Sequence, residues 1–198
     1  MDIIFDIGNV LIRWDLFAAF QDHFSDPAAL AGYLDRVGFA DWNHQADAGR
    51  PWAELVAELT ARHGPDAHPA VLYPARHALT ITQPIEGAWA LVDRLAARGH
   101  GLYALTNWSA ETFGQALDLH PRLSLFRDIV VSGREGLAKP DPAIFRLALD
   151  RWRLSPAATL FIDDNAANVA AAAGLGIDAV RFVDPDRLGR DLSARGLI

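Results

Sequence analysis

The sequence lacks cysteine altogether, which excludes disulfide bonds, thiolate metal sites and cysteine nucleophiles. It has no uninterrupted run of about 18 apolar residues, so we expect no membrane-spanning helix and no membrane partner. Positive charge is also scarce, since 18 Lys and Arg residues stand against 25 Asp and Glu residues and give a net charge of −7. Because binding to a phosphate backbone requires a basic surface, nucleic acid is not an expected partner either.

The beginning of the chain shows no signal-peptide pattern, because Asp2 and Asp6 interrupt its only apolar run and no basic residues precede that run. Together with the missing cysteines, this favours a cytoplasmic location. The 198 residues are 51% hydrophobic, a content typical of a packed globular protein. A chain of this length forms one large domain or a core domain that carries a smaller insert.

Short apolar segments alternate with amphipathic helical segments in the second half of the chain. The pattern predicts strands over 2–7, 101–106, 127–132, 158–163 and 178–182, and helices over 88–99, 109–119, 141–152, 165–176 and 184–192. Such alternation indicates an α/β fold with a parallel sheet covered by helices on both faces. Right-handed crossovers then place the carboxyl ends of the strands along one edge, where ligands bind.

The stretch before this alternation has a different texture. Helical segments are punctuated by Asp, Pro and Gly, and Asp26 followed by Pro27 is typical of a helix start. No strand-like run is found between residues 15 and 98, and "QPIEG" at residues 83–87 is interpreted as a linker. The sequence therefore predicts a helical insert after the first strand.

Polar side chains stand at the carboxyl ends of three predicted strands and before one helix: Asp6, Thr106, Asn107, Asp163, Asp164 and Lys139. Carboxylates that converge at one point repel each other unless a cation neutralises them. Oxygen ligands suit Mg²⁺, which bridges to a substrate phosphate. One carboxylate could then attack phosphorus and form an aspartyl-phosphate, while Thr106, Asn107 and Lys139 hold the phosphoryl oxygens.

Each of these residues also has a structural interpretation. An aspartate before a glycine is often a turn residue, and Asp164 or Asn165 could cap the following helix while Asp163 binds metal. A Thr-Asn pair or a lysine before a proline is common without any catalytic role. The order of the residues along the chain, each after a separate strand, favours the catalytic interpretation.

In this order the residues resemble the motifs of the haloacid dehalogenase superfamily. Asp6 in "FDIGNVL" matches the nucleophile and metal ligand, and Thr106 in "LYALTNW" matches the second motif. Lys139 in "GLAKPDPAIF" matches the phosphate-binding lysine, and Asp163 and Asp164 in "FIDDNAANVAAAAGLG" match the acidic metal pair. The resemblance covers essentially the whole chain.

The resemblance implies a Rossmann-like core with strand order 5-4-1-2-3 and a small helical cap that selects the substrate. The corresponding boundaries are a core domain of residues 1–14 and 84–198 and a cap of residues 15–83. The phosphatases of the superfamily usually carry a second aspartate two residues after the nucleophile, where this chain has Gly8. A backbone carbonyl at Gly8 can still serve the metal, but the proton-transfer role is lost.

Three functions remain open at this stage. A Mg²⁺-dependent phosphatase acting on a small phosphorylated metabolite, such as a sugar phosphate, is favoured. A metal-independent 2-haloacid dehalogenase fits less well, because the superfamily's dehalogenases do not keep the acidic pair and carboxylates hinder attack on an anionic substrate. A non-catalytic protein that binds a phosphorylated ligand is the third reading, since losing an acid typically costs about 10²- to 10⁴-fold in rate. A monomer and a homodimer are equally compatible with the sequence.

The cap segment "DWNHQADAGR" offers candidates for substrate contact, namely Trp42, Asn43 and Arg50. His44 in the same segment, or Asp15, could replace the missing acid, although structural roles are as easily assigned to both. Histidine is of interest because its pKa lies near neutrality. Among the six tryptophans, Trp108 beside Asn107 is the one expected to face the site.

Overall fold

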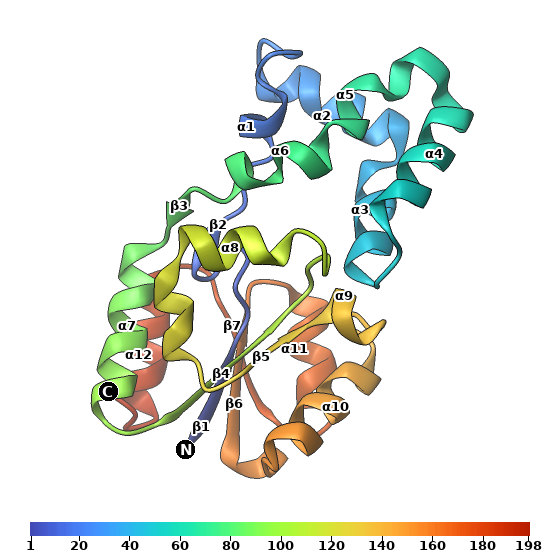
Figure 1. The fold of residues 1–198 in the computed structure, drawn as a ribbon. Coiled ribbons are helices and arrows are strands. Elements are labelled where there is room, and N and C mark those ends of the chain that lie inside the picture. The colour runs from blue at the N-terminus through green and yellow to red at the C-terminus, as the bar shows by residue number, and fades with distance from the viewer.

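A computed structural model describes residues 1–198 and contains a five-stranded parallel sheet (Figure 1). The sheet order is β5-β4-β1-β6-β7. The bounds are β1 Asp2–Phe5, β4 Gly101–Thr106, β5 Ile129–Val131, β6 Thr159–Asp163 and β7 Asp178–Arg181. When only these strands are counted in chain order, the sequence read from the β7 edge is 5-4-1-2-3, so the predicted α/β fold and strand order are confirmed.

Both faces of the sheet are buried, which explains why its strands are almost purely apolar. Ile3 and Phe5 of β1 belong to an apolar cluster on one face, whereas Ile4 packs in a second cluster on the other face. Helices α7, α8 and α12 contribute to the first cluster and α10 and α11 to the second, as Figure 1 shows. Their bounds are Glu86–Ala97, Phe113–Leu119, Pro185–Ala194, Pro142–Trp152 and Ala166–Ala173.

The third strand is shorter than predicted, because the chain leaves the sheet after Val131. Ser132 begins the short helix α9, Ser132–Glu135, and its hydroxyl accepts a hydrogen bond from the backbone N–H of Trp108 at 2.8 Å. A serine hydroxyl that bonds to a backbone N–H in this way competes with the backbone hydrogen bonds of a strand, which favours the end of β5 before Ser132.

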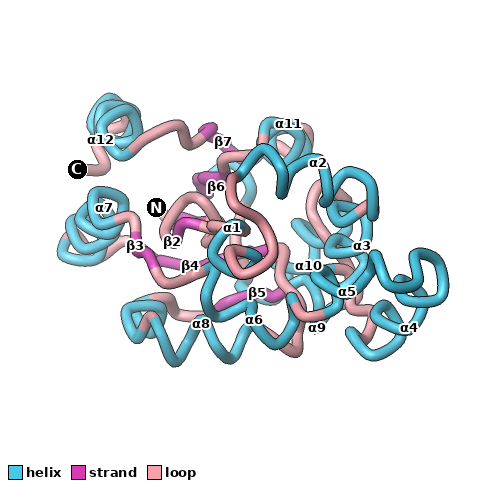
Figure 2. Tube along the Cα trace, turned by 90° about the horizontal axis from the view of Figure 1, so that it is seen from above, coloured by secondary structure: helices cyan, strands magenta, loops and turns pink.

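Six helices lie between β1 and α7 and form the helical insert, which stands beyond the carboxyl edge of the sheet (Figures 1 and 2). Their bounds are α1 Phe17–Phe20, α2 Pro27–Val37, α3 Phe39–Asp47, α4 Trp52–His63, α5 His68–Val71 and α6 Tyr73–Thr80. A separate apolar cluster with members only between Leu16 and Tyr73, apart from the peripheral Trp14, holds them together. The boundaries of core and cap drawn above stay a prediction.

The two crossings between sheet and insert are joined by a small antiparallel ladder. β2, Ile12–Arg13, pairs with β3, Gln83–Pro84. The expectation that residues 15–98 contain no strand is therefore wrong at β3. A two-residue strand carries no alternation that the sequence could show, since it exists only because β2 is brought beside it.

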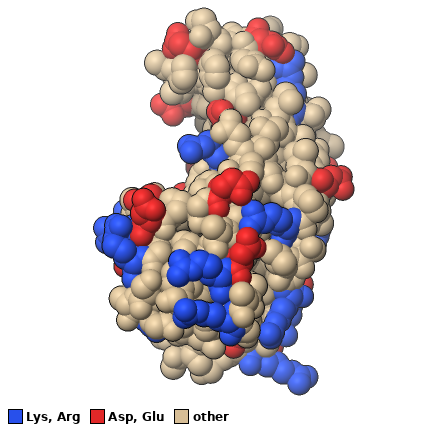
Figure 3. All heavy atoms as spheres, turned by 90° about the vertical axis from the view of Figure 1, so that its left-hand side faces the viewer, with Lys and Arg blue, Asp and Glu red and all other residues tan.

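The surface carries charges of both signs. Figure 3 shows blue and red side chains interspersed over the core on the face turned to the viewer. No helix of the structure has the length and apolar character required to cross a membrane.

Candidate active site

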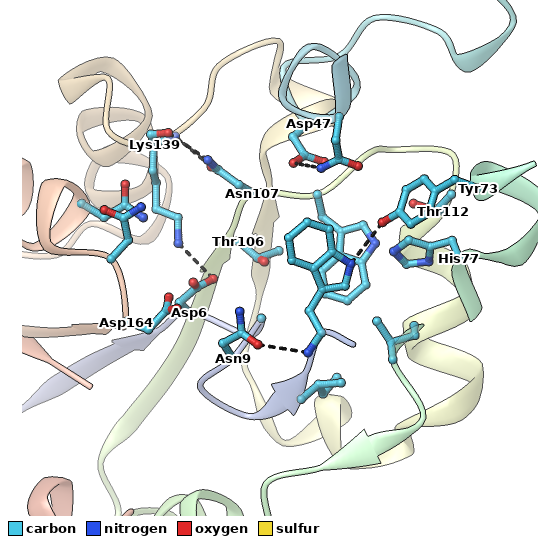
Figure 4. Close-up of a pocket in the computed structure, with 18 of the residues that line it drawn as sticks. Asp6, Asn9, Asp47, Tyr73, His77, Thr106, Asn107, Thr112, Lys139 and Asp164 are labelled. Carbon is cyan, nitrogen blue, oxygen red and sulfur yellow. Dashed lines mark hydrogen bonds and ion pairs between the residues drawn. The ribbon is translucent and has the colours of Figure 1, made fainter. Parts of the chain in front are cut away.

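The polar residues predicted at the strand ends meet at one pocket, between the carboxyl edge of the sheet and the helical insert (Figure 4). The cavity measures about 240 Å³. Seven residues predicted to form the site line it: Asp6, Gly8, Asn43, Thr106, Asn107, Lys139 and Asp164. Sequence reasoning therefore located the pocket, and the geometry of each residue decides what it can do there.

Asp6 directly follows β1 and presents one carboxylate oxygen to the pocket. Its Oδ1 accepts a hydrogen bond from the backbone N–H of Ile7 at 2.7 Å and forms an ion pair with Lys139 Nζ at 2.9 Å. Both contacts use the same oxygen, which leaves Oδ2 available to act as a nucleophile. Burial raises the pKa of the Asp6 carboxyl to about 7, because desolvation outweighs the attraction of Lys139.

Lys139 is buried, with only 1% of its side chain exposed. Its ammonium group contacts Asp6 Oδ1 and donates to Asp163 Oδ2 at 2.6 Å and to the backbone oxygen of Leu105 at 2.8 Å. Burial alone lowers the pKa of Lys139, but the charges on Asp6 and Asp163 outweigh burial and raise it. The lysine therefore stays charged and holds the nucleophile in place.

Asp163 ends β6 and Asp164 follows it, and the two have different surroundings. Asp163 is fully buried, and its oxygens accept from Lys139, from the backbone N–H of Asn165 at 2.8 Å and from Asn168 Nδ2 at 3.0 Å. Asp164 lines the pocket, and burial raises the pKa of its carboxyl. Asn165 caps α11 by accepting from the backbone N–H of Ala167, so the capping role falls on Asn165.

One oxygen from each of Asp6, Asp163 and Asp164 lies within 4.8 Å of the others. We call these three residues the acidic cluster. Its ligand atoms are all oxygens, as a hard divalent cation requires. Since Asp163 already accepts from three donors, Asp164 and Asp6 have more free lone pairs for a metal ion.

Thr106 ends β4, Asn107 follows it, and both line the pocket. The amide of Asn107 forms two hydrogen bonds with the backbone of Lys139, one from Nδ2 to the carbonyl oxygen and one accepted by Oδ1 from the N–H, each at 2.8 Å. Asn107 thus fixes the loop that carries Lys139 as well as lining the site. Its predicted role in substrate binding stays a prediction.

The turn after Asp6 keeps the floor of the pocket open at Gly8. A Cβ atom built on Gly8 meets no other atom within 4 Å, so the missing side chain leaves real space there. Asn9 takes a left-handed conformation with φ of 54° and its Oδ1 accepts from the backbone N–H of Trp14 at 3.1 Å. Asparagine tolerates this conformation because its short side chain bonds locally.

The prediction that Trp42 contacts the substrate is wrong. Trp42 does not line the pocket; it is 5% exposed, packs against Trp52 with ring centroids 4.8 Å apart, and donates from Nε1 to the backbone oxygen of Leu55. Its indole lies on the face of α3 that closes the core of the helical insert. Asn43, one position further along the helix, does line the pocket.

The other candidates of the cap segment lie elsewhere. Arg50 forms ion pairs with Glu58 and Glu54 on the surface of α4. His44 is exposed and Asp15 accepts from the backbone N–H of Phe17 at the start of α1; neither lines the pocket. The two residues considered as substitutes for the missing acid are therefore not placed to serve.

Sequence reasoning missed Asp47, the last residue of α3. Asp47 lines the pocket and accepts from Asn43 Nδ2 at 3.0 Å. Burial raises the pKa of its carboxyl to about 7, against the opposing effect of the Ser109 backbone N–H, and the charge on Asp6 adds to the rise. A signal was present in the sequence, because Asp47 is four residues from Asn43 and residues at this spacing share a helix face.

Aromatic side chains also line the pocket, and we call them the aromatic wall: Trp14, Trp52, Tyr73, His77 and Trp108. Figure 4 shows two of them, Tyr73 and His77, across the pocket from Asp6 and Asp164. Trp108 was expected there, and the others were not. Nδ1 of His77 lies 3.1 Å from Gln115 Oε1, and burial lowers the pKa of the imidazole to about 4. The imidazole is therefore neutral near pH 7.

Known proteins resemble this chain in sequence and in fold. The family model described as haloacid dehalogenase-like hydrolase matches residues 3–176. The sesquiterpene phosphatase astK of Aspergillus oryzae is 28% identical over 190 residues, which cover 91% of this chain and 89% of the relative.

Two solved structures share the fold. One is a variant of a HAD family enzyme from Bacteroides thetaiotaomicron, in complex with magnesium and inorganic phosphate, at 20% identity and a TM-score of 0.70 over 92% of this chain and 94% of that one. The other is the L-2-haloacid dehalogenase of Xanthobacter autotrophicus with chloropropionic acid covalently bound, at 17% identity and a TM-score of 0.64 over 100% and 84% of the two chains.

Proposed function

The chain belongs to the haloacid dehalogenase-like hydrolase family, and from this premise we propose that it is a magnesium-dependent phosphatase for a small phosphorylated metabolite. The observation that carries the proposal is the charge balance of the pocket. Of the 19 residues that line it, Lys139 is the only Lys or Arg, and two carboxylates, Asp6 and Asp163, already share its charge while Asp164 lies beside them. A phosphate dianion would be repelled by this arrangement unless a divalent cation bound beside it.

The residues fit a magnesium ion. Asp6 and Asp164 have oxygens free to bind it, Asp163 supplies a third carboxylate within the 4.8 Å cluster, and the backbone of Gly8 lies at the same pocket. Magnesium binds through one or two carboxylates and keeps its remaining positions for water and substrate phosphate. When bound, the ion would neutralise the charge of the phosphoryl oxygens.

The protein's own residues carry the transfer of the phosphoryl group. Oδ2 of Asp6 attacks phosphorus and forms an aspartyl-phosphate, while Lys139 keeps Oδ1 oriented. The hydroxyl of Thr106 at the end of β4 faces the transferred group, and Asn107 holds the Lys139 loop. Water then attacks phosphorus in the intermediate, which releases phosphate and restores the Asp6 carboxylate.

The organic part of the substrate would lie against the aromatic wall. A cavity of about 240 Å³ suits a small metabolite. Trp14, which is only partly buried, can pack against the C–H groups of a sugar ring, which supports a sugar phosphate as the substrate. The relative from Aspergillus oryzae is named a sesquiterpene phosphatase, so prenyl phosphates belong in the same substrate screen.

Removal of the metal ion tests the proposal. With excess EDTA, phosphate release is expected to fall by about 10²-fold or more, because a bound metal supplies several kcal/mol of charge stabilisation. Addition of Mg²⁺ beyond the chelator should restore the rate. The measurement is phosphate release from phosphorylated sugars, nucleotides, acids and prenyl alcohols.

The same assay separates the two other functions. Metal-independent release of halide from chloroacetate or 2-chloropropionate would identify a dehalogenase and overturn the phosphatase proposal. Binding of phosphorylated compounds with no turnover across the whole panel, with or without Mg²⁺, would identify a binding protein instead.

A further inference from the structure

The proposed reaction leaves one proton without a donor. When Asp6 attacks phosphorus, the oxygen of the leaving alcohol takes up negative charge and must be protonated unless the leaving anion is stable. Gly8 stands where the phosphatases of the family usually carry the acid, and it has no side chain to give. The inference below rests on the proposed phosphatase function.

Six titratable groups line the pocket, and most of them are already engaged or unsuited to donate a proton. Asp6, Asp164 and Lys139 belong to the nucleophile and the metal site. Tyr73 is a poor acid, because burial raises its pKa further and its hydroxyl accepts from Trp14 Nε1 at 3.1 Å. These four groups are therefore not available as proton donors.

His77 is excluded by its tautomer. Because Gln115 Oε1 can only accept, the imidazole of His77 must donate to it from Nδ1. The ring is neutral, so Nε2 carries no proton and cannot give one to the substrate. Asp47 is the one remaining titratable group of the pocket.

Asp47 is held firmly against the core. Its backbone oxygen accepts from Ser132 Oγ, and its carboxyl accepts from Asn43 Nδ2. Two residues later, Gly49 has a φ of 99°, and a Cβ atom there would lie 3.1 Å from the backbone oxygen of Gly133. The chain after α3 thus touches α9 so closely that the position of Asp47 over the sheet edge is fixed.

The two carboxylates face the same cavity from different parts of the fold. Figure 4 shows Asp47 reaching in from the end of α3, while Asp6 lies across the pocket at the end of β1 with Thr106 between them. No hydrogen bond joins Asp47 to the acidic cluster. Because the attacking and leaving oxygens lie roughly in line, the leaving oxygen of a phosphate ester seated on Asp6 points away from Asp6, into the part of the pocket that Asp47 lines.

We propose that Asp47 is the general acid and base that replaces the side chain missing at Gly8. As the Asp6 Oδ2–phosphorus bond forms and the phosphorus–oxygen bond of the ester breaks, the carboxylic acid of Asp47 gives its proton to the leaving oxygen. The Asp47 carboxylate then takes a proton from the water that attacks phosphorus. Phosphate leaves, and both aspartates return to their starting forms.

The surroundings of Asp47 move its titration close to neutral pH, so that both its acid form and its base form are accessible there. Burial raises the pKa of its carboxyl to about 7, and the carbonyl end of α3 also disfavours a negative charge. Asp6 is the charged group that acts on it from the core. On α9, Arg134 lies over the ring of Phe113 and Glu135 pairs with Arg151, so neither side chain offsets this effect.

The test compares two classes of leaving group in the full-length protein with Mg²⁺. Asp47→Asn is expected to lower kcat by about 10²- to 10⁴-fold for an alkyl phosphate, such as the best sugar phosphate of the screen. For p-nitrophenyl phosphate, whose leaving anion is stable without a proton, the loss should be less than about tenfold. Asp41→Asn, on the exposed face of the same helix, is the matched control and should retain both rates.

Equal losses on both substrates, or no loss on either, would overturn the role of Asp47 while leaving the phosphatase proposal intact. Failure of the wild-type protein to hydrolyse any phosphate ester would overturn the proposed function, and this inference with it.

The pH dependence of the rate gives a further test. In the wild type, activity should fall as pH rises through about 7, because the acid form of Asp47 is lost there, and this fall should be missing in Asp47→Asn.

A second variant and a folding measurement keep the test independent of misfolding. Gly8→Asp has room for its side chain, so the double variant Gly8→Asp, Asp47→Asn should recover hydrolysis of the alkyl phosphate. A double variant as slow as Asp47→Asn alone would count against proton transfer by Asp47.

Since the folded-state pKa of Asp47 is raised, its ionisation costs stability as pH rises from about 4 to about 7. Asp47→Asn should therefore raise Tm at pH 8 and not at pH 4.

Discussion

Replacing Asp6 by asparagine is expected to lower phosphate release by a factor on the order of 10⁴ to 10⁶, as loss of a nucleophile does in other hydrolases. Asparagine has nearly the same size, and its amide oxygen can still accept from Ile7 and Lys139 as Asp6 Oδ1 does. An amide oxygen does not attack phosphorus, so the aspartyl-phosphate cannot form. The fold should therefore persist while turnover stops.

Two measurements check this result. Acid quenching during turnover should trap a phosphorylated protein for the wild type and none for Asp6→Asn. Asp2→Asn, at the opposite end of β1, is the matched control and should keep the wild-type rate. If Asp6→Asn hydrolysed the substrate as fast as an active wild type, the nucleophile would have to be another residue. If the wild type and the variant were both equally slow, the result would favour a binding protein over a phosphatase.

The core half of the site was predictable because topology alone brings it together. In a parallel sheet every strand ends at the same edge, so Asp6, Thr106 and Asp163 had to converge once the strands were recognised. The detailed bonding was not predictable. Nothing in the sequence shows that Asn107 holds the Lys139 backbone or that Asp163 is saturated by Asn168, because these contacts depend on loop conformation.

The half of the site that the helical insert supplies was predicted less well, and the reason is helical phase. Asn43 and Asp47 are four residues apart and share the face of α3 that meets the pocket. Trp42 and Ala46 share the neighbouring face, which packs inside the insert. If Asn43 faces the pocket, the helical repeat places Asp47 on the same face and turns Trp42 away from it. The sequence alone does not show which face of the helix meets the pocket and which is buried in the insert, so this rotation of the helix could not be assigned.

Replacing Lys139 by methionine is expected to lower the free energy of unfolding by about 3–5 kcal/mol, the usual effect of removing one partner of a buried ion pair. The ammonium group is 1% exposed and lies between two carboxylates, 2.9 Å from Asp6 and 2.6 Å from Asp163. Methionine fills the space but leaves both carboxylates without their positive partner and the Leu105 carbonyl without the ammonium donor. Urea unfolding at neutral pH measures the loss.

Arg151→Met is the control for the Lys139 experiment, since Arg151 pairs with Glu135 on the surface with 39% of its side chain exposed. Exposed pairs contribute about 0–1 kcal/mol, so its loss should be small. Lys139→Arg is not a conservative alternative. A planar guanidinium cannot reproduce three contacts that radiate from one small ammonium group in a closed site.

Magnesium turns the Lys139 experiment into a test of the metal site as well. In Lys139→Met the acidic cluster has lost its only cation, so added Mg²⁺ should bind the folded protein and return part of the lost stability. Adding Asp6→Asn to Lys139→Met should also return some of the lost stability, because it removes one of the unpaired charges. The difference between the stability change of the double variant and the sum of the two single changes measures the coupling between Lys139 and Asp6. A loss below about 1 kcal/mol for Lys139→Met, unchanged by Mg²⁺, would mean that these carboxylates are held neutral rather than paired. In that case the charge balance from which the metal was inferred would no longer require one.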